Sequence, residues 1–387
     1  MTVWTPLVGQ ARAVATLQAA AADAAARLAS PGARGADAMT HAWLLTGPPG
    51  SGRSTAARAF AAAVQCASGG CGDCASCQTV AAGTHPDVEV VATELLSIGV
   101  RDTRELVRRA ALAPVGGRYQ ILVYEDADRL TEQAANALLK AIEEPAPRTV
   151  WILCAPSVED VLPTIRSRCR LVHLVTPSAR DIAALLRAEG VPEELAEFAA
   201  AASQGHIGRA RRLASDPAAR ERRAAVLGSV RGLRDVPDCL RTAAGLLEAV
   251  KAEVEAAGAL TDATERESLK AALGVGGPRE RQPPGAAAAL KELEKRQRGR
   301  ATRAMRDGLD RALIDLTALY RDVLAHQLQA DVAPVHSDRA AEVAELSEGG
   351  SPEVTLRQIE ALLACRTALD ANVAPLLAVE VMTLALR

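Results

Sequence analysis

The sequence predicts an α/β domain with a parallel sheet, followed by an all-α lid and an all-α C-terminal domain. Five short apolar runs within the first 176 residues alternate with helical segments, which is the pattern of a parallel sheet. The first run leads into a glycine-rich loop that opens a helix, and strand patterns stop after residue 176. We therefore expect domains over residues 1–176, 177–240 and 241–387.

Five strands are expected in the first domain, with helices between them. The strands are predicted at Ala42–Thr46, Val88–Val91, Gln120–Tyr124, Thr149–Cys154 and Leu171–Leu174. The helices are predicted at Val8–Leu28, Thr55–Gln65, Arg101–Ala113 and Thr131–Glu143. Ser178–Glu189, Pro192–Ser203 and Gly208–Ala214 predict the helical lid. The segment 30–35 is expected to be flexible.

The composition narrows the class of function. The chain has 387 residues, a net charge of −2 and 2% aromatic residues. Neither a general attraction to DNA nor base stacking along single strands is expected as its main activity. Its beginning lacks a basic region followed by an apolar run, so we expect a cytoplasmic protein without membrane contact. In that compartment the 8 cysteines favour metal ligands or free thiols over disulfides.

Residues 47–54 match a phosphate-binding loop, with a strand before it and a helix after it. Glycines allow backbone N–H groups to turn toward phosphates, and the helix start adds its positive dipole end. Ser54 supplies the hydroxyl that would hold Mg²⁺, whereas Arg53 stands where lysine is expected. The candidate nucleotide contacts are Gly47, Gly50, Gly52, Arg53 and Ser54. A glycine loop that merely turns the chain is the alternative, and binding of ATP and Mg²⁺ stays open.

An acidic pair ends the third predicted strand. Glu125 and Asp126 stand where phosphate-loop ATPases place a metal-binding carboxylate and then a base that orients water. The usual order of these acids in AAA+ proteins is aspartate and then glutamate, so each carboxylate here is displaced by about one methylene. Displacement by about 1 Å costs on the order of 10²-fold in rate, so we expect poor hydrolysis. A solvated strand end is the alternative.

Four cysteines within twelve residues predict a structural zinc site. Their spacing and the glycines between them suit tetrahedral Zn²⁺, and four thiolates leave no position for water. The ligands are Cys66, Cys71, Cys74 and Cys77. Unliganded or redox-active thiols are the alternative. Cys154, by contrast, lies in an apolar strand and is expected in the core.

An arginine before the last strand is a candidate arginine finger. Arg168 lies in Pro163–Cys169, on the rim opposite the phosphate loop, where it would face a neighbour in a ring. A guanidinium there can reach the γ-phosphate of a neighbouring subunit. The alternative is a surface salt bridge.

The chain resembles bacterial DNA polymerase III clamp-loader subunits of the AAA+ class, and among them the delta-prime group. The resemblance is dense over residues 5–176 and thin in the helical tail. The matching segments are Gly47–Ser54, the four-cysteine knuckle, Gly83–Asp87, Thr131–Pro145, Ser167–Cys169 and Asn372–Glu380. The zinc knuckle is shared with the motor subunit, gamma/tau, so it does not distinguish the two groups.

Four departures from the motor subunit imply a ring member with little or no ATPase activity alone. They are Arg53, the reversed pair Glu125–Asp126, the absence of a sensing threonine at Cys154–Pro156, and Gly208 where the lid's sensing arginine is expected, with Arg209 one place away. The alternative is the ATP-hydrolysing gamma/tau-like motor or another phosphate-loop ATPase. A zinc-dependent nucleic-acid-binding module is a further alternative, which the charge and the few aromatic residues disfavour.

The resemblance implies a rigid stator of the clamp loader. Its residues 241–387 would form a collar that joins gamma/tau and delta subunits in a hetero-pentamer, and Arg168 would complete an adjacent ATPase site. The complex would load the sliding clamp on primer-template DNA. Val8–Gln10 would lie near the adenine side of the old nucleotide site, and Lys140 would face the central channel, near DNA or simply in a packed helix.

The segment 274–306 has an open role. Gly274–Gly285 predicts an exposed loop, and the highly charged run Lys291–Arg306 follows it. That run is interpreted either as a basic patch that touches DNA or as a solvated helix face.

Overall fold

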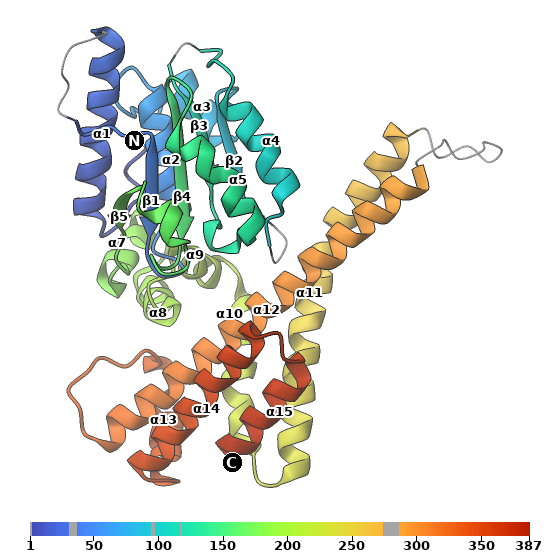
Figure 1. Cartoon of the computed structure of the whole chain (residues 1–387). Coiled ribbons are helices and arrows are strands. Elements are labelled where there is room, and N and C mark those ends of the chain that lie inside the picture. Colours follow the sequence, from blue (N-terminus) through green and yellow to red (C-terminus); the bar gives the residue numbers. More distant parts are fainter. Residues whose placement is uncertain (1, 31–36, 94–96, 117, 274–285) are drawn as a thin grey trace. The chain divides into compact units, whose positions relative to one another are not determined.

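The structure is a computed structural model that describes residues 2–30, 37–93, 97–116, 118–273 and 286–387, without the side chains of residues 232, 260, 272 and 286. The chain forms two compact units, residues 1–214 and 215–387 (Figure 1). Most of the segment expected to be flexible after Ser30, and the predicted exposed loop at 274–285, lie outside the described residues. The three-domain division at residues 176 and 240 remains a prediction.

A five-stranded parallel sheet forms the centre of the first unit, in the order β2-β3-β4-β1-β5. All five strands lie at the expected positions: β1 (Ala42–Thr46), β2 (Val88–Val91), β3 (Gln120–Tyr124), β4 (Thr149–Ala155) and β5 (Arg170–His173). In the register, Leu45 lies opposite Cys154 and Val172. The predicted fold class, an α/β phosphate-loop domain with a parallel sheet followed by helices, is confirmed.

Alternate side chains of the strands fill two separate apolar layers. Trp43 and Ile152 belong to the layer that packs against α1 (Ala11–Ala29) and α2 (Arg53–Gln65). Leu44 and Trp151 belong to the opposite layer, which packs against α4 (Val100–Ala110) and α5 (Glu132–Glu143). A sheet covered on both faces explains why these strands are continuous apolar runs.

Further helices complete the first unit. They are α3 (Ala75–Ala81), η1 (Ala127–Arg129), α6 (Pro163–Arg166), α7 (Ala179–Ala188), α8 (Glu193–Ser203) and α9 (Ile207–Ser215). The helix predicted from Val8 begins at Ala11, because Gly9 has a φ of 73°. The turn at Gly9 matters for the site, since it turns the chain just before Gln10.

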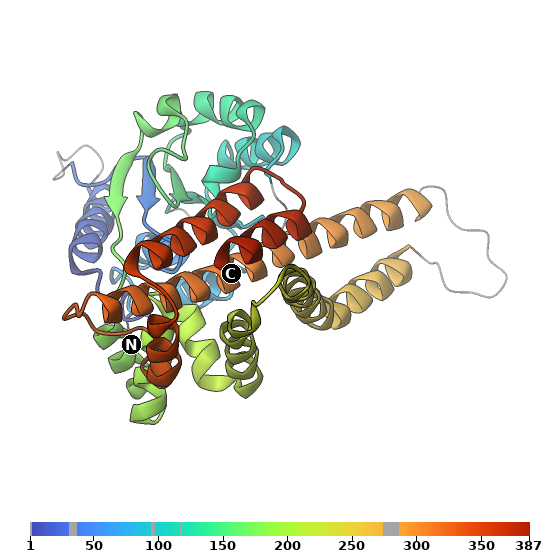
Figure 2. The ribbon, with the colours of Figure 1, turned by 90° about the horizontal axis from the view of Figure 1, so that it is seen from below.

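The described part of the second unit is helical, as predicted. Its elements are α10 (Pro217–Gly228), η2 (Ser229–Gly232), α11 (Val236–Ala272), α12 (Ala286–Gln327), η3 (Ser337–Arg339), α13 (Ala340–Glu348), α14 (Pro352–Asp370) and α15 (Pro375–Leu386). α12 packs against α11, α13 and α14, and α15 packs against α11 and α14 (Figure 2). Leu309, Leu313, Leu362 and Val379 are fully buried in their shared core. Among the described helices, none combines the length and the apolar character needed to cross a membrane.

A buried carboxylate joins the end of α12 to the segment before η3. The Asp322 carboxylate accepts hydrogen bonds from the backbone N–H groups of Val335 and His336, at 3.1 and 2.8 Å, and from Nδ1 of His336 at 3.0 Å. Arg321 Nη1 lies 2.9 Å from the same carboxylate. Burial raises the pKa of Asp322, but the hydrogen bonds from His336 and Val335 outweigh burial and hold that pKa below its usual value.

Asp322→Asn is expected to destabilise the second unit and to flatten its response to acid. A carboxyl whose folded pKa lies below the unfolded value of about 3.9 stabilises the fold above that pH and loses this stabilisation as the pH falls through the folded pKa. Loss of the charged acceptor should cost about 2–3 kcal/mol at pH 7. Chemical unfolding between pH 7 and pH 2.5 measures both effects, with exposed Asp331→Asn as the matched control. Identical acid unfolding of the two variants would contradict the role of Asp322.

Candidate functional site

The predicted phosphate loop lies between β1 and α2. Gly50 and Gly52 have φ angles of 86° and 92°, which favour glycine, and Gly52 caps the N-terminus of α2. The loop therefore ends at a helix start, the arrangement that suits binding of an anion. The backbone N–H of Gly47 donates to the carbonyl of Pro156, which ties the loop to the segment after β4.

Arg53 folds back onto the loop to which it belongs. Its Nη1 donates a hydrogen bond to the carbonyl oxygen of Gly47, the first residue of the loop. Burial lowers the pKa of Arg53, while Cys154, Asp128 and Asp126 oppose this change. The guanidinium thus closes the loop from within, whereas a phosphate-binding lysine would extend outward as a point charge.

A second arginine of α2, Arg58, which was not predicted from the sequence, reaches the acidic residue that follows β3. Arg58 Nε lies 2.8 Å from Oε1 of Glu125, whose side chain is 14% exposed. Arg58 stands four residues after Ser54 and so on the same face of α2, a spacing that places it near the loop but does not identify Glu125 as its partner. Glu125 is therefore neutralised by a side chain of the chain itself, at the place expected for a metal-binding carboxylate.

The remaining acids near the loop differ from one another in environment. Asp126 Oδ1 lies 3.9 Å from Arg129 Nε, at the start of η1. Burial raises the pKa of Asp128, and Asp126 adds to that increase. Cys154 is fully buried in β4, as predicted, and burial also raises the pKa of its thiol. At this position of β4 the chain presents a thiol, where a sensing residue would present a hydroxyl.

The start of α9 lies directly against the loop. A Cβ added at Gly50 would come within 2.5–2.6 Å of the Cα, Cβ and Cγ of His206. The His206 ring accepts a hydrogen bond at Nδ1 from the backbone N–H of Arg209, which caps this end of α9. Gly208 follows in the first turn, where its Cβ would approach the His206 ring at 3.3 Å. The sequence gives no sign of this contact between His206 and Gly50.

Gln10 fastens the loop to the segment after β5. Its side-chain amide donates to the carbonyls of Ser51 and Val175, at 3.1 and 2.7 Å, and accepts a hydrogen bond from Val175 N–H at 3.1 Å. Gln10 is buried, and the hydroxyl of Ser51 is buried without a hydrogen-bond partner among the described residues. The adenine-side role expected for Val8–Gln10 remains a prediction.

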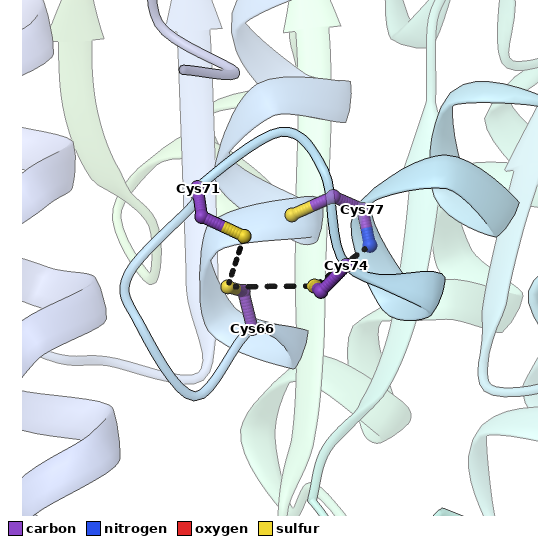
Figure 3. Close-up of side chains that lie close together, drawn as sticks. All are labelled: Cys66, Cys71, Cys74 and Cys77. Atoms are coloured by element: carbon purple, nitrogen blue, oxygen red, sulfur yellow. Dashed lines mark hydrogen bonds between the residues drawn. The ribbon is translucent and has the colours of Figure 1, made fainter. Parts of the chain in front are cut away.

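The four predicted zinc ligands lie close together (Figure 3). All four Sγ atoms lie within 4.8 Å of one another, and Cys66 Sγ is 3.7 Å from both Cys71 Sγ and Cys74 Sγ. Tetrahedral Zn²⁺ with Zn–S bonds of about 2.3 Å requires sulfur atoms about 3.8 Å apart. The residues therefore fit a tetrathiolate metal site.

Hydrogen bonds favour the thiolate of Cys66, whereas burial raises the pKa of Cys77 to about 12. Cys66 Sγ accepts from Ser68 N–H at 3.3 Å, and Cys74 Sγ accepts from Cys77 N–H at 3.5 Å. Burial raises the pKa of Cys66, but hydrogen bonds from Cys71, Gly70 and Ser68 outweigh it and lower that pKa to about 6. A thiolate is the form that binds a metal.

The cysteine knuckle is anchored to the rest of the first unit. Cys66 caps the end of α2, and Cys74 caps the start of α3. The N-terminal segment covers it, with Val3 N–H donating to Gly70 O at 3.1 Å and Trp4 Nε1 donating to Gly69 O at 3.3 Å. A metal here would hold α2, α3 and the N-terminal segment together.

Arg168 lies at the surface between α6 and the edge strand β5. Its Nη2 lies 2.5 Å from Oε1 of Glu143, at the end of α5, and its Nη1 donates to the carbonyl of Thr164 at 2.7 Å. The side chain remains 39% exposed. In the free chain the guanidinium is thus held in a surface salt bridge, while its exposed part faces solvent. Lys140, on the same helix as Glu143, is also exposed.

Comparison with known proteins agrees with this architecture. Residues 31–178 match the family model described as "DNA polymerase III, delta subunit". Over this stretch the chain is similar to DNA polymerase III subunits. The Pseudomonas aeruginosa DNA polymerase III subunit delta' is 41% identical over 164 residues, which cover 41% of this chain and 49% of that protein. The Escherichia coli K12 subunit delta' is 37% identical over 143 residues, 35% of this chain and 43% of that protein.

The chain is similarly close to the gamma/tau group. The Mycobacterium bovis DNA polymerase III subunit gamma/tau is 42% identical over 135 residues, which cover 34% of this chain and 23% of that protein. The chain thus matches about half or less of the length of each of these relatives. Overall similarity to the two groups is comparable, so the residues at the site must distinguish them.

Proposed function

We propose that this chain is a delta-prime-like stator of the DNA polymerase III clamp loader. In this proposal it supplies Arg168 to the nucleotide of a neighbouring ATPase subunit and hydrolyses little or no ATP itself. Its partners are gamma/tau and delta subunits in a hetero-pentamer. Through that complex it acts on the sliding clamp and primer-template DNA. The match of residues 31–178 to the family model, and the similarity of the chain to DNA polymerase III subunits delta' and gamma/tau, support this assignment.

The observation that carries the proposal is the internal neutralisation of the nucleotide site. Arg58 pairs with Glu125, and Arg53 donates to the Gly47 carbonyl, so the carboxylate that would hold Mg²⁺ and the cation that would meet a phosphate are both engaged within the chain. Metal binding at Glu125 would have to displace a charge-assisted hydrogen bond. These contacts, together with the reversed acids and the thiol of Cys154, favour a degenerate site over a motor site.

Arg168 suits the finger role on chemical grounds. Its guanidinium keeps a permanent charge and several N–H donors that match phosphate oxygens. The Glu143 carboxylate and the Thr164 carbonyl hold it in place while part of it remains exposed. We propose that a neighbouring γ-phosphate is its partner in the assembled ring, and that Arg168→Ala lowers hydrolysis there.

The rest of the chain has a supporting role in this proposal. Residues 177–240 act as the lid and residues 241–387 as the collar that joins the pentamer. α15 in the latter region exposes Leu377, Val381 and Leu384 at helical spacing, an apolar stripe of the kind that joins subunits. Zinc bound to the four cysteines is proposed to be structural, because four protein ligands leave no site for water.

Turnover by the purified chain alone tests the degenerate site against the motor alternative. We expect no saturable ATP hydrolysis, and we expect Arg53→Lys to remain inactive because Arg58 still pairs with Glu125. Arg53→Lys/Arg58→Ala, which releases Glu125, should bind MgATP more tightly than Arg53→Lys does. A coupled ATPase assay and nucleotide titration measure these quantities, with a gamma/tau subunit as the positive control. Brisk hydrolysis by the wild-type chain would favour the motor alternative.

A further inference from the structure

The part of the α11–α12 pair that follows Val250 on α11 and precedes Leu309 on α12, here called its outer half, has almost no apolar interior. The last fully or nearly buried apolar residue of α11 is Val250, and the first of α12 is Leu309. Between them, among the residues whose side chains are described, Gln297 is the one buried side chain. This part of the hairpin therefore gains little from the hydrophobic effect, which usually fixes paired helices.

Polar contacts hold the two helices of this outer half together. Gln297 Nε2 donates to the carbonyl of Asp262 at 3.0 Å. Arg300 Nη2 lies 2.6 Å from both Asp262 Oδ1 and Glu265 Oε2, and Arg266 pairs with Glu294 at 3.4 Å. The charges on the inner faces of the hairpin are thus satisfied by one another.

The outer face of α12 carries cations without acidic partners. Lys291, Lys295 and Arg298 recur at positions i, i+4 and i+7, so they lie on one face of the helix, and all three are exposed. None of them has an ion-pair partner within 4 Å among the described residues. We call Lys291, Lys295 and Arg298 the basic stripe. Exposed Arg296 lies at its flank.

The stripe has a definite length and chemistry. It extends over about 10 Å along the helix axis, which corresponds to about three base-pair steps of duplex DNA. Two acids, Glu292 and Glu294, neighbour the stripe at its start; Glu294 pairs with Arg266, and no acidic residue follows between Lys295 and Arg306. The hairpin contains no Phe, Tyr or Trp from residue 236 to residue 306, so it cannot stack on bases.

We propose that the basic stripe binds the phosphate backbone of duplex DNA without regard to base sequence. Phosphate contacts need positive charge in a suitable place and carry no base recognition, which is what the stripe offers. Because the whole chain has a net charge of −2, such binding must come from a local surface and not from overall charge. The proposal is independent of the arginine finger and of the degenerate nucleotide site.

The test is salt-dependent binding of the full chain to a fluorescent duplex of about 25 base pairs, in two unrelated sequences. Three phosphate contacts predict a slope of about −2.7 in a plot of log affinity against log salt, so affinity should fall about 40-fold between 50 and 200 mM salt. Lys291→Gln/Lys295→Gln/Arg298→Gln should remove most of this slope and lower affinity at 50 mM salt at least 10-fold. Both duplex sequences should behave alike.

A control variant removes the same three positive charges from α11, at positions where each cation is paired with an acid. Arg241, Lys251 and Lys270 each lie within 4 Å of an acid three residues away on α11, namely Asp238, Glu248 and Glu267. Arg241→Gln/Lys251→Gln/Lys270→Gln should therefore retain the DNA affinity of the wild-type chain. Circular dichroism compares the folding of the variants. In the wild-type chain, bound duplex should also protect Lys291 and Lys295 from acetylation.

Three results would overturn the assignment. The first is that the wild-type chain does not bind duplex at 50 mM salt. The second is that the two triple variants lose the same amount of affinity. The third is that polyglutamate or anionic lipid vesicles bind the stripe as tightly as DNA does at equal salt, which would assign the stripe to another acidic partner. Lack of acetylation protection at Lys291 and Lys295 would count against it even if a variant misfolded.

Discussion

Arg168→Ala is expected to lower ATP hydrolysis at the adjoining site of the reconstituted clamp loader by about 10³-fold or more, the usual contribution of an arginine finger. The total DNA-stimulated rate of the assembly should fall less, because its other sites depend on other subunits. The loss should appear in kcat, since the guanidinium stabilises charge that develops in the transition state. Steady-state and single-turnover hydrolysis with primed DNA measure it.

The controls for Arg168 lie in the same segment. Arg166→Ala removes an equal charge from an exposed position two residues earlier and should leave hydrolysis unchanged. Arg168→Lys keeps the charge but not the forked geometry and should recover a small part of the rate. Because the Arg168–Glu143 pair is exposed, its loss should cost less than about 1 kcal/mol, and the variant should remain folded. Normal hydrolysis by a complex that contains Arg168→Ala would refute the finger.

Cys74→Ser is expected to abolish zinc binding and to destabilise the first unit. One zinc per wild-type chain should fall to less than about a tenth, because a tetrathiolate site depends on every ligand. The loss of a structural metal belongs to the largest class of destabilising changes, about 4 kcal/mol or more. For a domain of this size that corresponds to a fall in Tm of roughly 8–16 °C. Elemental analysis and calorimetry measure the two effects.

A cysteine outside the knuckle provides the control for zinc. Cys169 is partly buried and is not one of the four clustered thiols, so Cys169→Ser should keep a full zinc content. Chelation of the wild-type chain should reproduce the lower Tm of Cys74→Ser and should not lower the Tm of that variant further. A wild-type chain that contains no zinc when produced in zinc-supplemented medium would leave the cysteines as thiols and refute the metal site.

The strands of the first unit and the cysteine cluster were predictable from the sequence. Strands covered on both faces must be apolar throughout, so runs such as Gln120–Tyr124 were recognised with their observed bounds. The four cysteines are close in the chain, and short glycine-containing turns can bring them together without help from distant residues. Local sequence was sufficient in both cases.

The contacts that determine the character of the nucleotide site were not predictable in the same way. The Arg58–Glu125 pair depends on how α2 lies against β3, since the two residues are 67 positions apart. The approach of His206 to Gly50 depends on the path of α7 and α8, which bring the chain back to the loop. The four-residue helix α6 is too short to produce a periodic pattern.

The contact between Gly50 and His206 has a mechanical consequence. Because the start of α9 rests on the loop with no room for even a methyl group at Gly50, any movement of the loop toward His206 must displace that helix. The whole of α9 would have to tilt aside, and the packing that fixes its buried residues Ala210 and Leu213 would resist. The path of the backbone at His206, and not the imidazole alone, sets this limit, so a smaller side chain at position 206 would relieve only part of it.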